Sequence, residues 1–199
     1  DHGRPIRLYH RRRRIIRLTG TKGVGHTGGS LSMADILAVL YFHTLRVDPR
    51  RPDWAERDRF VLSKGHSTPG YYSALAEAGF FPEEQLLEQY DEVNGCFQGH
   101  PDMNKTPGVD MSTGSLGQGL SVGIGLALGA AKRNLPSRAF VLMGDGEMQE
   151  GQVWEALMYA GANRVRHLVA IVDNNKLQLT APTADVLSLD PPLAAKIAA

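Results

Sequence analysis

A strand–helix–strand pattern in the second half of the chain constrains the fold more than any other feature. Two apolar, β-rich runs cover residues 138–143 and 167–172, and a helical run over residues 150–162 separates them. Strands that are joined through a helix run parallel, and parallel sheets are covered by helices on both faces. The pattern predicts an α/β fold in which a parallel sheet lies between two helical layers.

Further predicted elements fit this three-layer architecture. We expect a short strand at residues 60–62 and helices over residues 6–19, 31–45, 69–79, 83–92 and 116–134. Ser32 and Asp35 have the spacing of a capping box near the start of the second helix. Glycines recur in the last of these helices and weaken it, which predicts close backbone packing against another helix or a ligand.

Composition excludes several classes of protein. The 199 residues carry a formal net charge of +1, so we expect no binding to nucleic acid or to a membrane surface. The cluster Arg11 to Arg14 is interpreted as the solvated face of a basic helix. No apolar run reaches the roughly 18 residues that span a membrane. The single cysteine, Cys96, cannot form an intramolecular disulfide and fits a reducing compartment, so we expect a cytoplasmic protein.

Polar residues follow two neighbouring strands of the predicted sheet, where each strand ends. Asp145 lies between Gly144 and Gly146 after one strand, and Asn175 follows the next. Ligands of open parallel sheets bind beyond the carboxyl ends of the strands, where these loops would meet. Carboxylate, amide and carbonyl oxygens suit Mg²⁺ or Ca²⁺, the glycines let a phosphate approach, and the following helix would offer free N–H groups. We predict a divalent metal that holds a diphosphate.

Three of the seven histidines share a loop setting flanked by glycine or proline: His26, His66 and His100. This predicts one site that handles protons or polarises hydroxyl groups near neutral pH. The three are too far apart in sequence, and lack Cys or Glu partners at metal spacing, to indicate zinc. The glycine-rich runs 114–119 and 123–129 neither match the dinucleotide fingerprint nor follow a strand.

Several long motifs resemble the transketolase family, in the same order along the chain. The run GDGEMQEG, followed thirty residues after Asp145 by Asn175, resembles the thiamine-diphosphate fingerprint. The chain is similar to transketolase over residues 25–184. Four further runs carry this similarity: GHTGGSLSMADILAVLYF, DRFVLSKGHSTPGYYSAL, QGHPD and TPGVDMSTGSLGQGLSVGIGLALG. The resemblance implies a pyrophosphate-binding domain with the thiamine-diphosphate-binding fold. The family's reaction moves a two-carbon ketol unit from a ketose phosphate to an aldose phosphate, with the cofactor as electron sink.

The resemblance also implies a role for individual residues. Asp145 and Asn175 would bind Mg²⁺ by their side chains and Leu177 by its backbone carbonyl, with Ca²⁺ as a possible substitute. Gly146 would contact the diphosphate, and Gly144 belongs to the same cofactor-binding set.

Other residues match the family's cofactor and substrate contacts. Gly114 and Leu116 would contact the aminopyrimidine through their backbone. Glu150, counted with the cofactor site, matches a glutamate buried at the subunit interface, whereas Glu147 and Gln149 are interpreted as solvated residues. The family's active-site histidines, which contact cofactor or sugar and assist proton transfer, are matched by His26, His66 and His100.

Two features differ from a complete member of the family. The run 191–199 reads as the start of another helix, whereas the family's domain continues to a further active-site histidine. The pyrimidine-binding domain, which supplies the activating glutamate and the arginines that hold sugar phosphate, is absent. We expect residues 1–199 to form one pyrophosphate-binding domain, truncated at its C-terminus and catalytically incomplete. It would need a C-terminal transketolase subunit, in a homodimer or heterotetramer that acts on sugar phosphates.

Alternatives stay open at this point. The chain could be the N-terminal subunit of a split transketolase or a fragment of a longer polypeptide. Many full-length members have proline where this chain has Ser115, which weakly favours the split-subunit interpretation. A 1-deoxyxylulose-5-phosphate synthase shares the GDG and NN runs, although residues 63–75 fit transketolase better. A non-catalytic cofactor-binding subunit is a third interpretation, and the retention of all three loop histidines speaks against it.

Overall fold

A parallel sheet of three strands lies at the centre of the computed structural model, which describes residues 4–189 and 192–198. The strands are arranged in the order β1 (Arg59–Leu62), β2 (Ala139–Gly144) and β3 (Leu168–Asp173). Both neighbouring pairs are parallel. Helix α7 (Gly151–Ala162) joins β2 to β3, so the predicted strand–helix–strand unit is confirmed.

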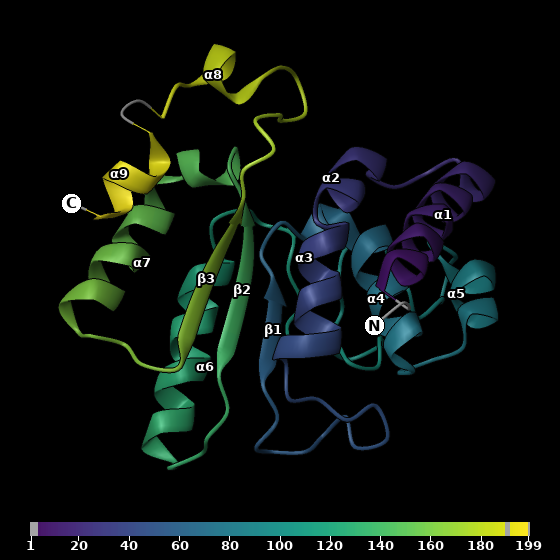
Figure 1. The fold of residues 1–199 in the computed structure, drawn as a ribbon, viewed down its shortest axis with the longest axis horizontal. Coiled ribbons are helices and arrows are strands. Elements are labelled where there is room, and N and C mark those ends of the chain that lie inside the picture. Colours follow the sequence, from purple (N-terminus) through teal and green to yellow (C-terminus); the bar gives the residue numbers. More distant parts are fainter. Residues whose placement is uncertain (1–3, 190–191, 199) are drawn as a thin grey trace.

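Helices cover the sheet on both faces, as Figure 1 shows. The elements before and after β1 are α1 (Arg4–Lys22), α2 (Thr27–Ser32), α3 (Ala34–Val39), the π-helical turn η1 (Leu40–Thr44), the 3₁₀ turn η2 (Gly65–Ser67), α4 (Thr68–Ala78) and α5 (Glu83–Gln89). The later elements are α6 (Gly119–Lys132), the 3₁₀ turn η3 (Glu147–Gln149), α8 (Thr183–Val186) and α9 (Leu193–Ala198). Within the described ranges, none of these helices combines the length and apolar character that crossing a membrane requires.

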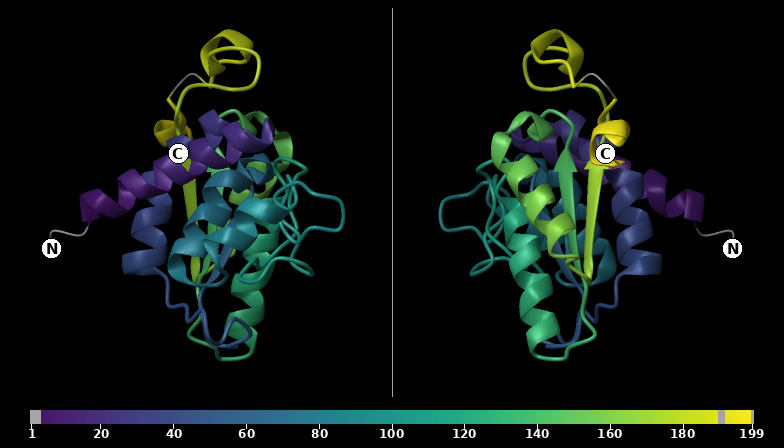
Figure 2. Two further views of the ribbon diagram at one scale, coloured as in Figure 1. Left: turned by 90° about the vertical axis from the view of Figure 1, so that its right-hand side faces the viewer. Right: turned by 90° about the vertical axis from the view of Figure 1, so that its left-hand side faces the viewer.

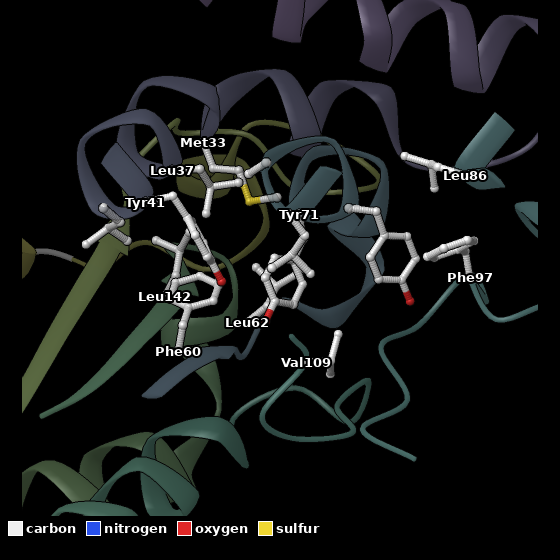
Figure 3. Close-up of a cluster of buried hydrophobic side chains, with 14 of the residues drawn as sticks. Met33, Leu37, Tyr41, Phe60, Leu62, Tyr71, Leu86, Phe97, Val109 and Leu142 are labelled. Carbon is white, nitrogen blue, oxygen red and sulfur yellow. The ribbon is translucent and has the colours of Figure 1, made fainter. Parts of the chain in front are cut away.

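Side chains of the strands alternate between two cores. Phe60 and Leu142 belong to the larger core, which helices α3 to α5 complete with Leu37, Tyr71 and Leu86; Figure 3 shows this cluster. The second core lies on the opposite face, where Val61, Val141 and Met143 pack with α6 and α7. Successive strand residues point to opposite faces, so each strand contributes to both cores. This confirms the three-layer arrangement expected from the sequence.

The predicted helix over residues 31–45 is divided into α2, α3 and η1. The proposed capping box is wrong, because neither Ser32 nor any other side chain caps α3. Ser32 Oγ instead donates to the Asp173 carboxylate at the end of β3. A distant acceptor therefore competes successfully for this hydroxyl, and Ser32 becomes part of the site described below.

The interpretation of the arginine cluster as a solvated face is wrong for its first and last members. Arg11 is fully buried, and its guanidinium donates to Glu77 Oε2 at 2.9 Å and to the Ala34 carbonyl at 3.0 Å. Arg14 donates to Glu83 Oε2 at 2.6 Å. These contacts tie α1 to α3, α4 and α5, so the basic helix is held by charge pairing as well as by its apolar stripe.

The glycines of α6 serve two different purposes. A Cβ on Gly123 would lie 2.2 Å from Val141 Cγ2, so glycine is needed where the helix crosses the sheet. Gly125 and Gly129 face open space instead. The predicted close packing of the glycine-rich helix therefore holds for one side of it only.

Candidate active site

The loops that follow the three strands meet at one end of the sheet. Figure 1 shows α2 and α8 at this end, and both views of Figure 2 show the segment around α8 extending beyond it. β1 leads to Lys64 and His66, β2 leads to Asp145, and β3 ends at Asp173, two residues before Asn175. The carboxyl ends of the strands thus assemble the polar residues that the sequence places in separate loops.

Asp145 connects β2 to the loop after β3. It is 3% exposed, and its Oδ1 accepts from the Gly146 N–H at 3.0 Å. Oδ2 accepts from the Lys176 N–H at 2.7 Å and from Thr183 Oγ1 at 3.1 Å. Lys176 has a φ of 62°, a left-handed conformation that non-glycine residues seldom adopt. The backbone of this loop is therefore strained at Lys176, the residue whose N–H contacts Asp145.

A chain of polar contacts orients Asn175. Its Nδ2 donates to Ser32 Oγ at 3.3 Å, and Ser32 Oγ donates to Asp173 Oδ2. Lys64 Nζ donates to the same carboxylate oxygen at 2.7 Å, with 2% of the Lys64 side chain exposed. Because the amide nitrogen is engaged by Ser32, Asn175 Oδ1 faces the loop, where it accepts from the Leu177 N–H at 2.8 Å.

The oxygen donors around Asp145 fit a hard divalent cation. A carboxylate has about four lone-pair positions, and hydrogen bonds use three of those on Asp145. Asn175 Oδ1 uses one of its two for the Leu177 N–H. The described residues include no group of three or more His, Cys, Asp or Glu side chains placed to hold a metal. A metal here would therefore combine one carboxylate with amide, backbone and water oxygens, a set that Mg²⁺ accepts.

The three loop histidines lie close to one another. The rings of His26 and His66 have centroids 4.9 Å apart. A Cβ on Gly114 would lie 3.0 Å from His100 Cδ2, so His100 packs on that glycine. Burial lowers the pKa of His66 to about 4, and the neighbouring His26, Lys64 and His100 act in the same direction. His66 is therefore neutral at pH 7, with one ring nitrogen as a donor and the other as an acceptor.

The loop before α6 packs against the residues that follow β1. Thr113 Oγ1 donates to a carbonyl of β1 at 2.7 Å, and a Cβ on Gly65 would lie 2.8 Å from the Gly114 nitrogen. Gln152 Nε2 donates to the Leu116 carbonyl at 2.8 Å. Both ends of the segment that carries Gly114 and Leu116 are thus fixed, one to β1 and one to α7.

The turn after Asp145 differs from the expected free helix terminus. The N–H groups of Met148 and Gln149 donate to the carbonyls of Asp145 and Gly146, at 3.1 and 3.2 Å. They are used within the turn and are not available to an anion. A Cβ on Gly146 would lie 3.0 Å from Gln178 Cβ, whereas one on Gly144 would lie 3.9 Å from Lys64 Cδ. Glycine at position 146 is therefore favoured by the packing of the protein itself.

Glu147 is not the solvated residue that the sequence indicates, because it is 3% exposed. Its carboxylate accepts from Ser63 Oγ, from the Gly117 N–H at 2.8 Å and from the Gly144 N–H at 3.0 Å. Gln149, also expected to be solvated, is half-buried, and its Nε2 donates to a glutamine side chain at 3.0 Å. Glu150 is exposed at the start of α7.

The sequence does not assign to the site three polar residues at this end of the sheet, of which Lys64 and Glu147 are buried and Ser32 is half-buried. Lys64, Ser32 and Glu147 bond to partners 109, 141 and 84 positions away. One local signal is available for Lys64: this charged residue comes two positions after the last residue of the apolar strand β1 and two positions before His66. A charge at the end of a buried strand needs a partner, which points to a site.

Fold and site together define a class of protein. A parallel sheet between helices, with the GDG turn after one strand and Asn175 after the next, is typical of thiamine-diphosphate-binding domains. The sequence profile described as "Transketolase, thiamine diphosphate binding domain" matches residues 16–192. The chain belongs to the transketolase family.

Individual relatives agree with this assignment. The chain is 47% identical to the 6-deoxy-6-sulfo-D-fructose transketolase subunit SqwG of Clostridium sp. (strain MSTE9), over 94% of this chain and 69% of the relative. It is 45% identical to an apulose-4-phosphate transketolase subunit of Actinobacillus succinogenes, over 90% of this chain and 65% of the relative.

Solved structures match the fold as well. The transketolase of Pichia stipitis in complex with sedoheptulose-7-phosphate superposes with a TM-score of 0.90 and 28% identity, over the whole of this chain. This chain covers 30% of that protein. It therefore corresponds to about two thirds of the subunit relatives and to less than a third of the solved transketolase.

Proposed function

We propose that residues 1–199 form the pyrophosphate-binding domain of a transketolase that binds thiamine diphosphate through Mg²⁺. The observation that carries the proposal is the contact between Asp145 and the loop after β3. The Lys176 N–H lies 2.7 Å from Asp145 Oδ2, which brings Asn175 and Leu177 to the same carboxylate. The charged neighbours of His66 include Lys64, whose Nζ donates to Asp173 Oδ2 at the end of β3, so the histidines lie at the same end of the sheet.

Each group has a defined task in this proposal. Asp145, Asn175 and the Leu177 carbonyl would hold the metal, and the metal with Gly144 and Gly146 would hold the diphosphate. Gly114 and Leu116 would contact the aminopyrimidine by their backbone. When bound, thiamine diphosphate supplies a nucleophilic carbon and an electron sink for transfer of a two-carbon ketol unit.

The histidines would move protons at the substrate hydroxyl groups. His66 is neutral at pH 7 because burial lowers its pKa to about 4, so its ring can accept a proton from a hydroxyl or hold that hydroxyl by a hydrogen bond. His26 and His100 are exposed to solvent. A neutral imidazole with two solvent-exposed ones close by suits a site where a hydroxyl is deprotonated and later reprotonated.

Activity would require a partner that carries the pyrimidine-binding domain. Both relatives described above are named as subunits of a transketolase, which supports a separate C-terminal partner in a homodimeric or heterotetrameric assembly. Glu150, exposed here, would become buried at that subunit interface. The substrates would be sugar phosphates or similarly anionic sugars, and the location cytoplasmic.

The test is a ketol-transfer assay of the full-length protein with its partner subunit. His66→Ala and His100→Ala are each expected to lower kcat by at least about tenfold, as loss of a proton-transferring group does. Far-ultraviolet circular dichroism checks that both variants remain folded. His43→Ala, a change of the same kind in the π-helical turn η1, serves as the control and is expected to retain activity. Unchanged turnover in both site variants would reject the catalytic role of these histidines.

A further inference from the structure

Glu147 connects three segments that lie far apart in the sequence. Its carboxylate accepts from Ser63 Oγ after β1, from the Gly117 N–H before α6, and from the Gly144 N–H at the end of β2. The two N–H contacts measure 2.8 and 3.0 Å, and the residue is 3% exposed. Water therefore cannot readily replace a lost contact at this position.

The surrounding backbone is packed as closely as glycine allows. A Cβ on Gly119 would lie 2.3 Å from Ser63 Oγ, and one on Gly117 would lie 2.8 Å from Gln152 Nε2. Gly117 also has a φ of 83°, which disfavours any side chain. The backbone around Glu147 is therefore packed too closely at Gly117 and Gly119 to admit a side chain at either position.

The chemistry of the three partners requires a carboxylate. All three partners donate, and an ionised carboxylate is the side chain that accepts in every direction. A glutamine of the same shape presents one oxygen and turns its NH₂ group toward one of the donors. One buried N–H or O–H group would then lose its acceptor, which costs much more than the net value of a hydrogen bond.

We propose that Glu147 is a positioning residue for cofactor binding. By holding the Gly117 and Gly144 N–H groups on one carboxylate, it fixes the segment that carries Gly114 and Leu116 relative to the turn that carries Asp145. The pyrimidine contacts and the metal ligand are thereby held at a constant separation before the cofactor arrives. The identity of the ligand rests on the proposed function. The link that Glu147 makes between the segment before α6 and the turn after β2 does not depend on it.

The experiment compares Glu147→Gln with Glu77→Gln in the full-length protein assembled with its partner subunit. Glu77 is a suitable control because it is a charge-paired, largely buried glutamate of α4 that contacts Arg11 of α1, away from the loops after the strands. Hydrogen exchange is measured at the Gly117 and Gly144 amides without ligand. Calorimetry with thiamine diphosphate and Mg²⁺ then gives Kd, and the transfer assay gives kcat at saturating cofactor.

We expect Glu147→Gln to raise exchange at one or both amides and to weaken cofactor binding roughly ten- to hundredfold, as loss of a supporting contact does. The decrease in kcat at saturating cofactor should be smaller than the loss of affinity. Glu77→Gln should change neither the two amides nor Kd. Ser63→Ala removes one donor with little change of volume and should weaken binding in the same direction, so the inference remains testable if Glu147→Gln does not fold.

Three results would overturn the inference: exchange at both amides that matches the wild type, cofactor affinity within twofold of the wild type, or an equal loss of affinity in Glu77→Gln. A wild-type protein that fails to bind the cofactor would instead refute the proposed function, and the positioning role with it. Normal binding by the wild type and by Glu147→Gln alike would refute the positioning role alone.

Discussion

Replacing Lys64 with methionine should destabilise the protein strongly, because it removes one partner of a buried ion pair. The Lys64 and Asp173 side chains are 2% and 7% exposed, and their charged atoms lie 2.7 Å apart. Lys64 Nζ also donates to the Gly29 carbonyl at 3.1 Å. Without the ammonium group, Asp173 keeps Ser32 as a donor but loses its compensating charge. Breaking a buried pair in this way costs about 3–5 kcal/mol.

That loss would be a large part of the total stability, which for a typical domain is about 5–15 kcal/mol. Denaturant unfolding of the wild type, Lys64→Met, Asp173→Asn and the double variant gives the four corners of a mutant cycle. The double variant should recover part of the loss, because the buried carboxylate is then neutralised, and we expect a coupling of at least about 1.5 kcal/mol.

The control is Lys22→Met, which removes the more exposed pair of Lys22 with Glu92, whose side chains are 17% and 57% exposed. Exposed ion pairs contribute about 1 kcal/mol or less, so this change should be small. Equal effects of Lys64→Met and Lys22→Met, or a coupling near zero in the cycle, would refute the reasoning from burial.

Two other predictions follow from the geometry. The ring of His66 should titrate by NMR with a midpoint near 4, and a midpoint near the ordinary value of 6.5 would contradict its burial. Because its pKa is lowered by folding, the unfolded chain binds more protons between pH 6.5 and 4, so His66 should reduce stability as pH falls through that window. Gly123→Ala should lower the free energy of unfolding by about 1–3 kcal/mol, since its Cβ would meet Val141 at 2.2 Å. Gly125 faces open space, so Gly125→Ala should raise the free energy of unfolding by up to about 1 kcal/mol, measured by denaturant unfolding. Equal effects of the two substitutions would contradict the packing described for α6.

The fold could be predicted where the pattern is local. The apolar runs of β2 and β3 and the helix between them all lie between Ala139 and Asp173, so periodicity and connection length suffice to predict a parallel unit. Gly79 ends α4 with a φ of 93°, as expected for glycine after a helix. The proximity of the loops that carry Asp145 and Asn175 follows from the same rule about strand ends.

Burial of individual charges could not be predicted, because it depends on distant partners. Arg11 is buried between partners that are distant in sequence, Glu77 at 66 positions and the Ala34 carbonyl at 23 positions. Glu147 is next to a turn in sequence, and a solvated position is the ordinary expectation for such a residue. Two of its three donors, Ser63 and Gly117, lie 84 and 30 positions away, so no local pattern reveals them. The same applies to Ser32, whose hydroxyl has a local capping role available and bonds Asp173 instead.

The most direct test of the central claim is the metal dependence of cofactor binding. Calorimetry of the full-length protein with its partner would compare thiamine diphosphate binding in Mg²⁺ with binding in a metal chelator, for the wild type and for Asp145→Asn. We predict that chelation weakens wild-type binding at least about tenfold and that Asp145→Asn shows weak binding under both conditions, because a carboxylate ligand is lost. Equal affinity of the wild type with and without divalent metal would contradict the account.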